Sequence, residues 1–184
     1  MITKTTTFSF LLLLAAVMGA GAVSMQAQVV PSAIKSPISL TVGGTVSVFD
    51  PNYIQNKLVG AGAFVDVNLF HGIGVEAEGR WQRFHETEGI SQDNYLIGPR
   101  VQVLHFWRLR PYAKVLGGFS NMNFEEGIGS GRFTTLAFGG GVDIKMTRRL
   151  SVRAFDAEYQ YWPSFLGGTL TPYGASAGIS YRIF

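Results

Sequence analysis

The chain has 184 residues, of which 47% are hydrophobic and 15% are charged; this suits one domain of ordinary size with a full set of apolar residues and excludes a multidomain assembly. The formal net charge of +3 is too small for a surface that binds nucleic acid, so no nucleic-acid partner is expected. The lack of cysteine excludes disulfides, thiolate metal ligands and a cysteine nucleophile.

The N-terminal residues have the pattern of a secretory signal peptide. Lys4 precedes an apolar run over residues 8–18, and small residues follow it. The run is shorter than the ~20 apolar residues that a membrane-spanning helix needs, which favours a cleaved leader over an anchor helix. We expect a signal peptide over residues 1–27, a periplasmic N-terminal segment over residues 28–37, and one domain over residues 38–184.

From residue 38 onward, apolar and polar residues alternate with a period of two, which is typical of β-strands with one apolar face. The predicted strands cover residues 38–48, 59–69, 73–82, 95–103, 113–117, 136–146, 150–161 and 173–183. Eight strands of about ten residues each make the smallest outer-membrane barrel. No later stretch is long and apolar enough for a spanning helix, so if this domain crosses a membrane, it must do so as a closed barrel.

Two positions depart from the regular alternation. Arg153 falls on one parity while Asp156 and Glu158 fall on the other, so a β-bulge near Phe155 is required to bring these charges to one face. Pro99 has no N–H to donate to a neighbouring strand, and we expect it at a bulge or at a strand end.

The connections between the predicted strands alternate in length. They are tight at residues 71–72, 106–109 and 147–149, and long at residues 50–57, 85–93, 120–132 and 162–171. Short periplasmic turns and longer outer loops are typical of outer-membrane barrels, and an even strand count places both chain ends on the periplasmic side.

The apolar face of the strands is aliphatic at the strand centres and aromatic toward both ends. Trp81, Phe133 and Trp162 belong to the band near the long loops, and Trp107 to the band near the tight turns. A soluble lipocalin-like barrel would turn its apolar face inward, and periodicity alone does not orient the faces. Two aromatic bands around an aliphatic belt favour a surface that faces lipid.

The opposite face carries acidic and basic residues in balance, and we expect them to fill the lumen as a paired network. The predicted network consists of Asp66, Glu76, Glu78, Arg80, Arg100, Lys114, Asp143, Lys145, Arg153, Asp156, Glu158 and Arg182.

Three segments carry a family resemblance: Gly139-Gly140-Gly141-Val142-Asp143, Glu158-Tyr159-Gln160-Tyr161 and Gly178-Ile179-Ser180-Tyr181-Arg182-Ile183-Phe184. Residues 38–184 resemble the OmpA/OmpX-like small outer-membrane β-barrel family. The resemblance implies an all-β fold, an eight-stranded antiparallel transmembrane barrel with up-and-down meander order, in the outer membrane of a Gram-negative bacterium.

The same resemblance implies that Tyr181, Ile183 and Phe184 form a C-terminal signal that the barrel-assembly machinery recognises. Phe184 departs from the pattern, because it falls on the parity opposite to Tyr181 and Ile183. OmpA-like barrels also often place one residue between the inward arginine and the glutamate of the second segment, whereas four residues separate Arg153 from Glu158 here. The proposed bulge accounts for the longer spacing.

These observations favour a structural or surface-interaction role, with membrane lipid and lipopolysaccharide around the wall and a surface ligand at the long loops. His71, His85 and His105 have no metal-ligand spacing, and we expect no catalytic residue, cofactor or metal. Two alternatives stay open. One is a lipid A deacylase or acyltransferase that uses His85 and Ser91, and the other is a small low-conductance channel, which a filled lumen opposes.

Overall fold

The computed structural model describes residues 38–52, 57–83, 91–104, 106–124, 129–165 and 168–184. Within them the chain forms β1 (Ser39–Asp50), β2 (Leu58–Phe70), β3 (Ile73–Arg83), β4 (Ser91–Gln102), β5 (Leu109–Phe124), β6 (Gly129–Lys145), β7 (Leu150–Phe165), β8 (Gly168–Leu170) and β9 (Tyr173–Arg182). No helix among the described residues is long and apolar enough to span a membrane.

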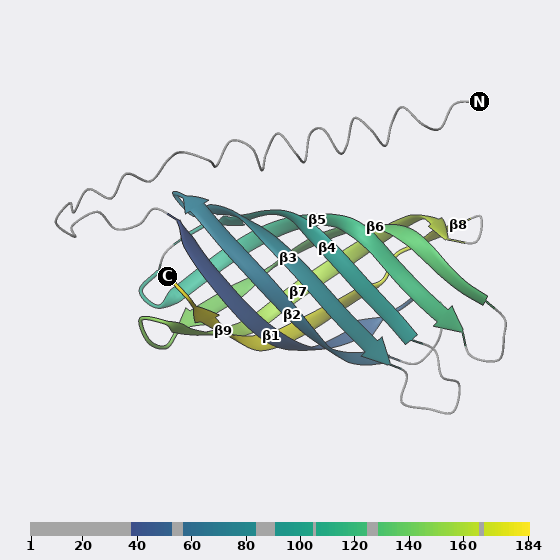
Figure 1. Cartoon of the computed structure of the whole chain (residues 1–184), viewed down its shortest axis with the longest axis horizontal. Coiled ribbons are helices and arrows are strands. Elements are labelled where there is room, and N and C mark those ends of the chain that lie inside the picture. The colour runs from purple at the N-terminus through teal and green to yellow at the C-terminus, as the bar shows by residue number, and fades with distance from the viewer. Residues whose placement is uncertain (1–37, 53–56, 84–90, 105, 125–128, 166–167) are drawn as a thin grey trace, which may run out of the picture. The chain divides into compact units, whose positions relative to one another are not determined.

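Eight of these strands close a barrel in meander order (Figure 1). Each of β1 to β6 pairs with the strand that follows it, in antiparallel fashion. β7 then pairs with β9, and β9 pairs with β1 to close the ring. The three-residue β8 pairs only with the end of β7, outside the barrel ring. The predicted eight-stranded antiparallel up-and-down barrel is therefore confirmed.

The tight connections gather at one end of the barrel, which we call the turn end. His71 and Gly72 join β2 to β3, and both have positive φ angles, of 51° and 83°, as a two-residue type I′ hairpin requires. Residues 103–104, 106–108 and 146–149 belong to the other two connections at this end. The connections between β1 and β2, β3 and β4, β5 and β6, and β7 and β9 lie at the opposite end, which we call the loop end.

One predicted long loop is mostly strand. β5 continues to Phe124 and β6 begins at Gly129, so residues 120–124 and 129–132 of the predicted loop belong to paired strands. The alternation is blurred there because the apolar Met122 and Phe133 share the inward parity with the polar Ser120 and Thr135. The short strand predicted over residues 113–117 is thus the centre of a sixteen-residue strand.

The two irregular positions behave differently. The predicted bulge is confirmed, because Val142 of β6 faces Phe155 whereas Asp143 faces Arg153, which leaves Ala154 as the extra residue. The prediction for Pro99 is wrong: it lies inside β4 opposite Val75 of β3, with no shift in register. The pairing with β5 lapses at Pro99 instead, because its ring nitrogen has no hydrogen to donate.

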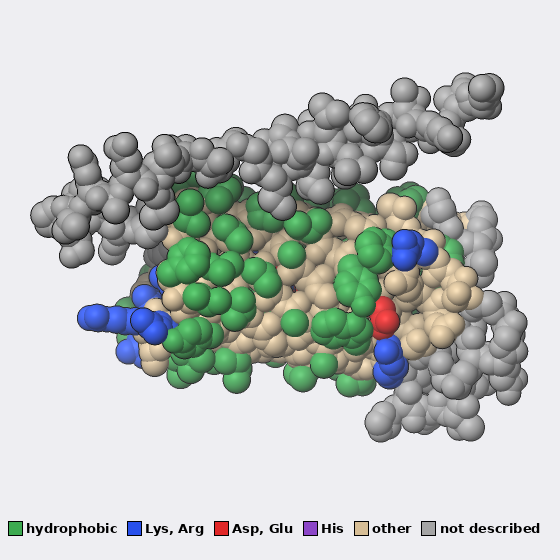
Figure 2. Space-filling model, in the orientation of Figure 1, with side chains coloured by type: hydrophobic (Ala, Val, Ile, Leu, Met, Phe, Trp, Pro, Cys, Tyr) green, Lys and Arg blue, Asp and Glu red, His purple; other side chains and the backbone are tan. Residues whose placement is uncertain are grey.

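The aliphatic residues cover the outer wall of the barrel, as Figure 2 shows for one face. Val46 is 66% exposed, while Thr45 and Ser47 beside it are buried. Two aromatic residues assigned to the outer wall instead point inward, since Trp162 is fully buried and Phe133 stacks on it. Both share the parity of the charged residues on their strands, and this parity decides their direction.

The orientation of the wall predicts the effect of charged substitutions at different depths. Val65→Arg and Val142→Arg place a cation in the lipid-facing belt, and we expect each to lower the free energy of unfolding in lipid by about 2–4 kcal/mol. Leu69→Arg, on the same face of β2 but nearer the turn end, is the matched control and should cost about 0–1 kcal/mol. Denaturant unfolding in lipid vesicles measures all three, and equal stability of Val65→Arg and wild type would contradict the assignment.

Candidate functional site

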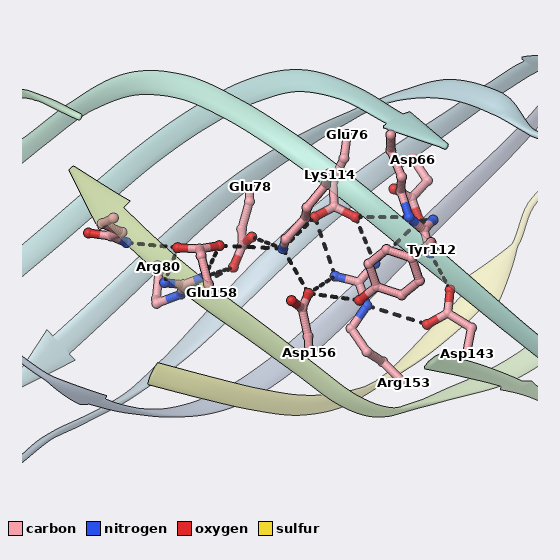
Figure 3. Close-up of polar contacts among 12 residues, drawn as sticks. Asp66, Glu76, Glu78, Arg80, Tyr112, Lys114, Asp143, Arg153, Asp156 and Glu158 are labelled. Atoms are coloured by element: carbon pink, nitrogen blue, oxygen red, sulfur yellow. Dashed lines mark hydrogen bonds and ion pairs between the residues drawn. The ribbon is translucent and has the colours of Figure 1, made fainter. Parts of the chain in front are cut away.

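The lumen of the barrel holds a continuous network of charged side chains (Figure 3). Ten of the twelve residues predicted for it are buried: Asp66, Glu76, Glu78, Arg80, Arg100, Lys114, Asp143, Arg153, Asp156 and Glu158. The other two, Lys145 and Arg182, are half-buried near the turn end. The ten come from β2 to β7, so the network ties together strands that are distant around the barrel wall.

Arg80 anchors the network on the side of the loop end. Its guanidinium donates to Glu78 on its own strand and to both carboxylate oxygens of Glu158 on β7, at 3.0 and 3.2 Å. Gln160 donates to Glu158 at 2.8 Å, and Trp162 donates to Gln160 at 3.0 Å. The polar chain therefore continues from the centre of the lumen to the buried indole of Trp162.

Lys114 occupies the middle of the network and contacts four carboxylates. Its Nζ atom lies 2.9 Å from Glu76, 3.0 Å from Glu78, 2.7 Å from Asp156 and 3.5 Å from Glu158. The side chain is fully buried, so these carboxylates replace the water that the ammonium group has lost.

Two arginines form the part nearest the turn end. Arg153 lies 2.8 Å from Glu76 and 3.3 Å from Asp156, and it also reaches Asp143 at 3.4 Å. Arg100 donates to Asp66 and to Asp143. In Figure 3 the contacts run without a break from Arg80 through Lys114 and Arg153 to Asp143.

Every carboxylate of the buried network contacts at least two cationic side chains, so six acidic groups share four cations. Moving an ionised group out of water has a large free-energy cost, and one ion pair in a low-dielectric interior rarely offsets it. Contact with two or more opposite charges offsets more of that cost. Removing one member leaves its partners charged and without water. The network therefore fixes the positions of the strands that supply it.

Aromatic rings inside the lumen pack against the arginines, which was not predicted from the sequence. The Arg153 guanidinium lies 3.6 Å from the centre of the Phe64 ring, Arg100 lies 3.8 Å from that of Tyr112, and Arg80 lies 4.3 Å from that of Phe49. The Tyr112 hydroxyl also donates to Asp156 at 2.8 Å. Parity was the available signal, because Phe64 alternates in step with Asp66, and Tyr112 with Lys114.

Glycines of β6 make room for the long side chains. A Cβ atom on Gly139 would lie 3.1 Å from a methylene carbon of Lys114, and one on Gly141 would lie 2.8 Å from the Tyr112 hydroxyl. The segment Gly139-Gly140-Gly141 lies inside a strand, so its role is close packing rather than phosphate binding.

An apolar cluster lies inside the barrel toward the loop end. Met122, Phe133, Trp162 and Leu170 pack together, and the Phe133 and Trp162 rings stack with their centres 5.8 Å apart. This end of the barrel therefore holds apolar side chains beside the buried amides of Gln82, Gln92 and Asn94.

The remaining predicted residues lie apart from the network. Tyr181, Ile183 and Phe184 are exposed at the turn end, where the Ile183 amide donates to Leu40 at 2.8 Å. His71 belongs to the β2–β3 turn, whereas His85 and His105 lie outside the described residues. Within the described part of the chain, no three His, Asp or Glu side chains are grouped to hold a metal ion.

Comparison with known proteins gives the same architecture. The family model described as "Outer membrane protein beta-barrel domain" matches residues 11–182. The structure resembles that of Neisserial surface protein A, with a TM-score of 0.64 at 9% identity over 79% of this chain and 97% of that one. Ail of Yersinia pestis matches with a TM-score of 0.53 at 20% identity, over the same shares of the two chains.

The N-terminal barrel domain of OprF from Pseudomonas aeruginosa matches with a TM-score of 0.54 at 14% identity, over 79% of this chain and 97% of that one. At these identities the solved structures show a shared fold. No curated protein matches the chain in sequence. The family match covers most of the chain, so the chain belongs to the outer-membrane protein β-barrel domain family and is a protein of the Gram-negative outer membrane.

Because the network shares its charges, replacing one charged residue with an uncharged one should lower the free energy of unfolding strongly. Glu76→Gln keeps the size of the side chain but removes the charge that faces Lys114 and Arg153, and we expect it to lower the free energy of unfolding by about 3–5 kcal/mol. Asp93→Asn, which breaks the exposed pair with Arg83, is the control and should cost about 0–1 kcal/mol. Urea unfolding in lipid measures both, and an equally small loss for the two variants would show that the lumenal pairs contribute little.

Proposed function

We propose that the protein is a closed barrel with a structural or surface-interaction role, held in the outer membrane by its aliphatic belt and plugged by the lumenal network. The observation that carries this proposal is the position of Lys114, whose ammonium group meets four carboxylates at 2.7–3.5 Å in the middle of the lumen. Side chains occupy the space through which solute would pass.

The plugged lumen favours this role over that of a channel. An eight-stranded barrel is just wide enough for its own side chains. Moving an ion through the lumen would require several buried ion pairs to separate at once, and each separation exposes an unpaired charge to a low-dielectric interior. The apolar cluster at the loop end adds a second barrier, because its buried members offer an ion nothing to replace its water.

The partners proposed for this role follow from the surfaces of the barrel. The wall takes membrane lipid and lipopolysaccharide, and the exposed Tyr181, Ile183 and Phe184 at the chain end suit recognition by the barrel-assembly machinery. In such barrels the short turns face the periplasm and the longer loops face outward. The connections at the loop end are therefore the part of the protein that contacts a ligand at the cell surface.

The charge of the loop-end segments narrows the kind of surface ligand. Residues 84–90 and 125–128 contain Glu86, Glu88, Glu125 and Glu126 and no lysine or arginine. Ail has been crystallised with a heparin analogue, sucrose octasulfate, which is a polyanion. The acidic segments of this chain favour a partner of the opposite kind, such as divalent cations that bridge lipopolysaccharide phosphates.

Planar-bilayer recording tests the plug. The purified wild-type protein should give no steady conductance steps, because the lumenal pairs stay closed. The double variant Glu78→Ser/Lys114→Ser removes one charge of each sign and two long side chains from the centre of the lumen, and it should give small, steady steps. Heat-modifiable gel migration shows whether each preparation is folded.

The matched control is Arg83→Ser/Asp93→Ser, which removes one charge of each sign from an exposed pair near the loop end. It should stay silent. Steady conductance from folded wild-type protein would overturn the proposed plug, and silence of the lumenal variant would show that the apolar cluster alone closes the barrel.

A further inference from the structure

The mouth of the lumen at the turn end is lined by an excess of basic side chains. Figure 2 shows lysine and arginine side chains gathered at this end of the barrel. A pocket there is lined by six cationic side chains, namely Arg100, Arg110, Lys145, Arg148, Arg149 and Arg182, and by two carboxylates, Asp66 and Asp143. We call this pocket the basic mouth.

The two carboxylates are already engaged by the network. Arg100, at the floor of the pocket, donates to both Asp66 and Asp143, and it is buried. Arg100 therefore neutralises much of the acidic charge that the pocket contains. Of the other cations that line the pocket, Arg110, Arg148, Arg149 and Arg182 make no ion pair with a described carboxylate, and Arg149 donates to the Tyr181 hydroxyl at 3.1 Å.

The side chains of this pocket lie close together. Arg100, Arg110, Arg182 and Asp143 all line it. The Arg182 amide donates to the Arg149 carbonyl at 2.7 Å, so the 146–149 turn lies beside the last residue of β9. Among the described residues, neither Arg110 nor Arg182 makes an ion pair.

Arg110 and Arg182 lie on the lumenal face of their strands and not on the face that contacts lipid. Arg110 shares the lumenal parity of Tyr112, while Leu109 beside it is exposed on the wall. Arg182 shares the lumenal parity of Ser180, while Tyr181 is exposed. Arginines that only reach for headgroups around the barrel would lie on the lipid-facing parity. These two point into the mouth.

We propose that the basic mouth is a binding site for a multivalent phosphate group. A single carboxylate would leave most of the excess positive charge in place, whereas a phosphate dianion or a diphosphate matches it more fully. Guanidinium groups bind phosphate oxygens through paired N–H donors. The hydroxyls of Thr41, Ser151 and Ser180, which also line the pocket, supply further hydrogen bonds.

The shared chemistry admits two sources of the phosphate. The turn end faces the periplasm in a barrel of this family, so the group belongs either to a soluble phosphate compound or to the headgroup of an anionic phospholipid in the inner leaflet. Half-burial of Arg110 and Arg182 weakens the screening by water and salt, which strengthens the attraction for either source.

Isothermal titration of the folded full-length protein in a non-ionic maltoside detergent tests the site. The probes are inorganic pyrophosphate, short-chain dihexanoyl phosphatidylglycerol below its micelle concentration, and acetate. We expect a saturable 1:1 heat with at least one phosphate probe and none with acetate at the same concentration. The phosphate probe that binds more tightly identifies the source, and both results support the proposal.

The variant Arg110→Gln/Arg182→Gln should weaken phosphate binding at least about tenfold, because two charge-assisted contacts are lost. The control Arg83→Gln/Arg132→Gln removes the same charge near the loop end and should bind like wild type. Heat-modifiable migration verifies that both are folded. The proposal is overturned if neither phosphate probe binds, if acetate binds as tightly, or if the two double variants weaken binding equally.

Discussion

The structure depends on one electrostatic constraint: charged groups that are enclosed by a narrow membrane barrel must each contact groups of opposite charge, because little water is left in the lumen to solvate them. The constraint explains why Lys114 lies among four carboxylates and why Arg153 reaches residues on β2, β3 and β6. It also explains the bulge at Ala154, which turns both Arg153 and Asp156 inward. A regular β7 would send one of these charges into lipid.

The two ends of the lumen differ, and the difference assigns them different roles. Toward the loop end, the charged network gives way to the apolar cluster of Met122, Phe133, Trp162 and Leu170. Toward the turn end, it opens into the basic mouth, where positive charge exceeds negative charge. The two ends of the lumen therefore differ in their chemistry, with apolar side chains toward the loop end and basic side chains at the turn end.

Much of the fold follows from the sequence because the side-chain period of a strand is two and one face must be apolar. Alternation located the strands, the balance of charge located the lumen, and the clash of parity between Arg153 and Asp156 located the bulge. The inward aromatic residues were harder to assign, because Trp162 and Phe133 are equally at home in a membrane-interface band and in a lumen. Only their parity distinguishes the two positions.

Other features were beyond the reach of periodicity. The pairs within the network depend on which residues face each other across the lumen, and that depends on the stagger of the strands around the closed barrel. The rule that places proline at a bulge or a strand end failed for Pro99. β4 keeps its register with both neighbouring strands and loses only its pairing with β5 at that point. The basic mouth combines residues from β5, β6, β9 and a turn, which are adjacent only after the barrel closes.

The central claim is that aliphatic side chains face lipid while the opposite parity faces a filled lumen. Nuclear Overhauser effects from lipid acyl chains to side-chain protons, measured for the folded protein in lipid nanodiscs, test it without any substitution. The account predicts transfer to Val46, Val48, Val59 and Val65, and none to Leu58 or Phe64 on the alternate positions of β2. Transfer to Leu58 and Phe64 with silence at the four valines would contradict it.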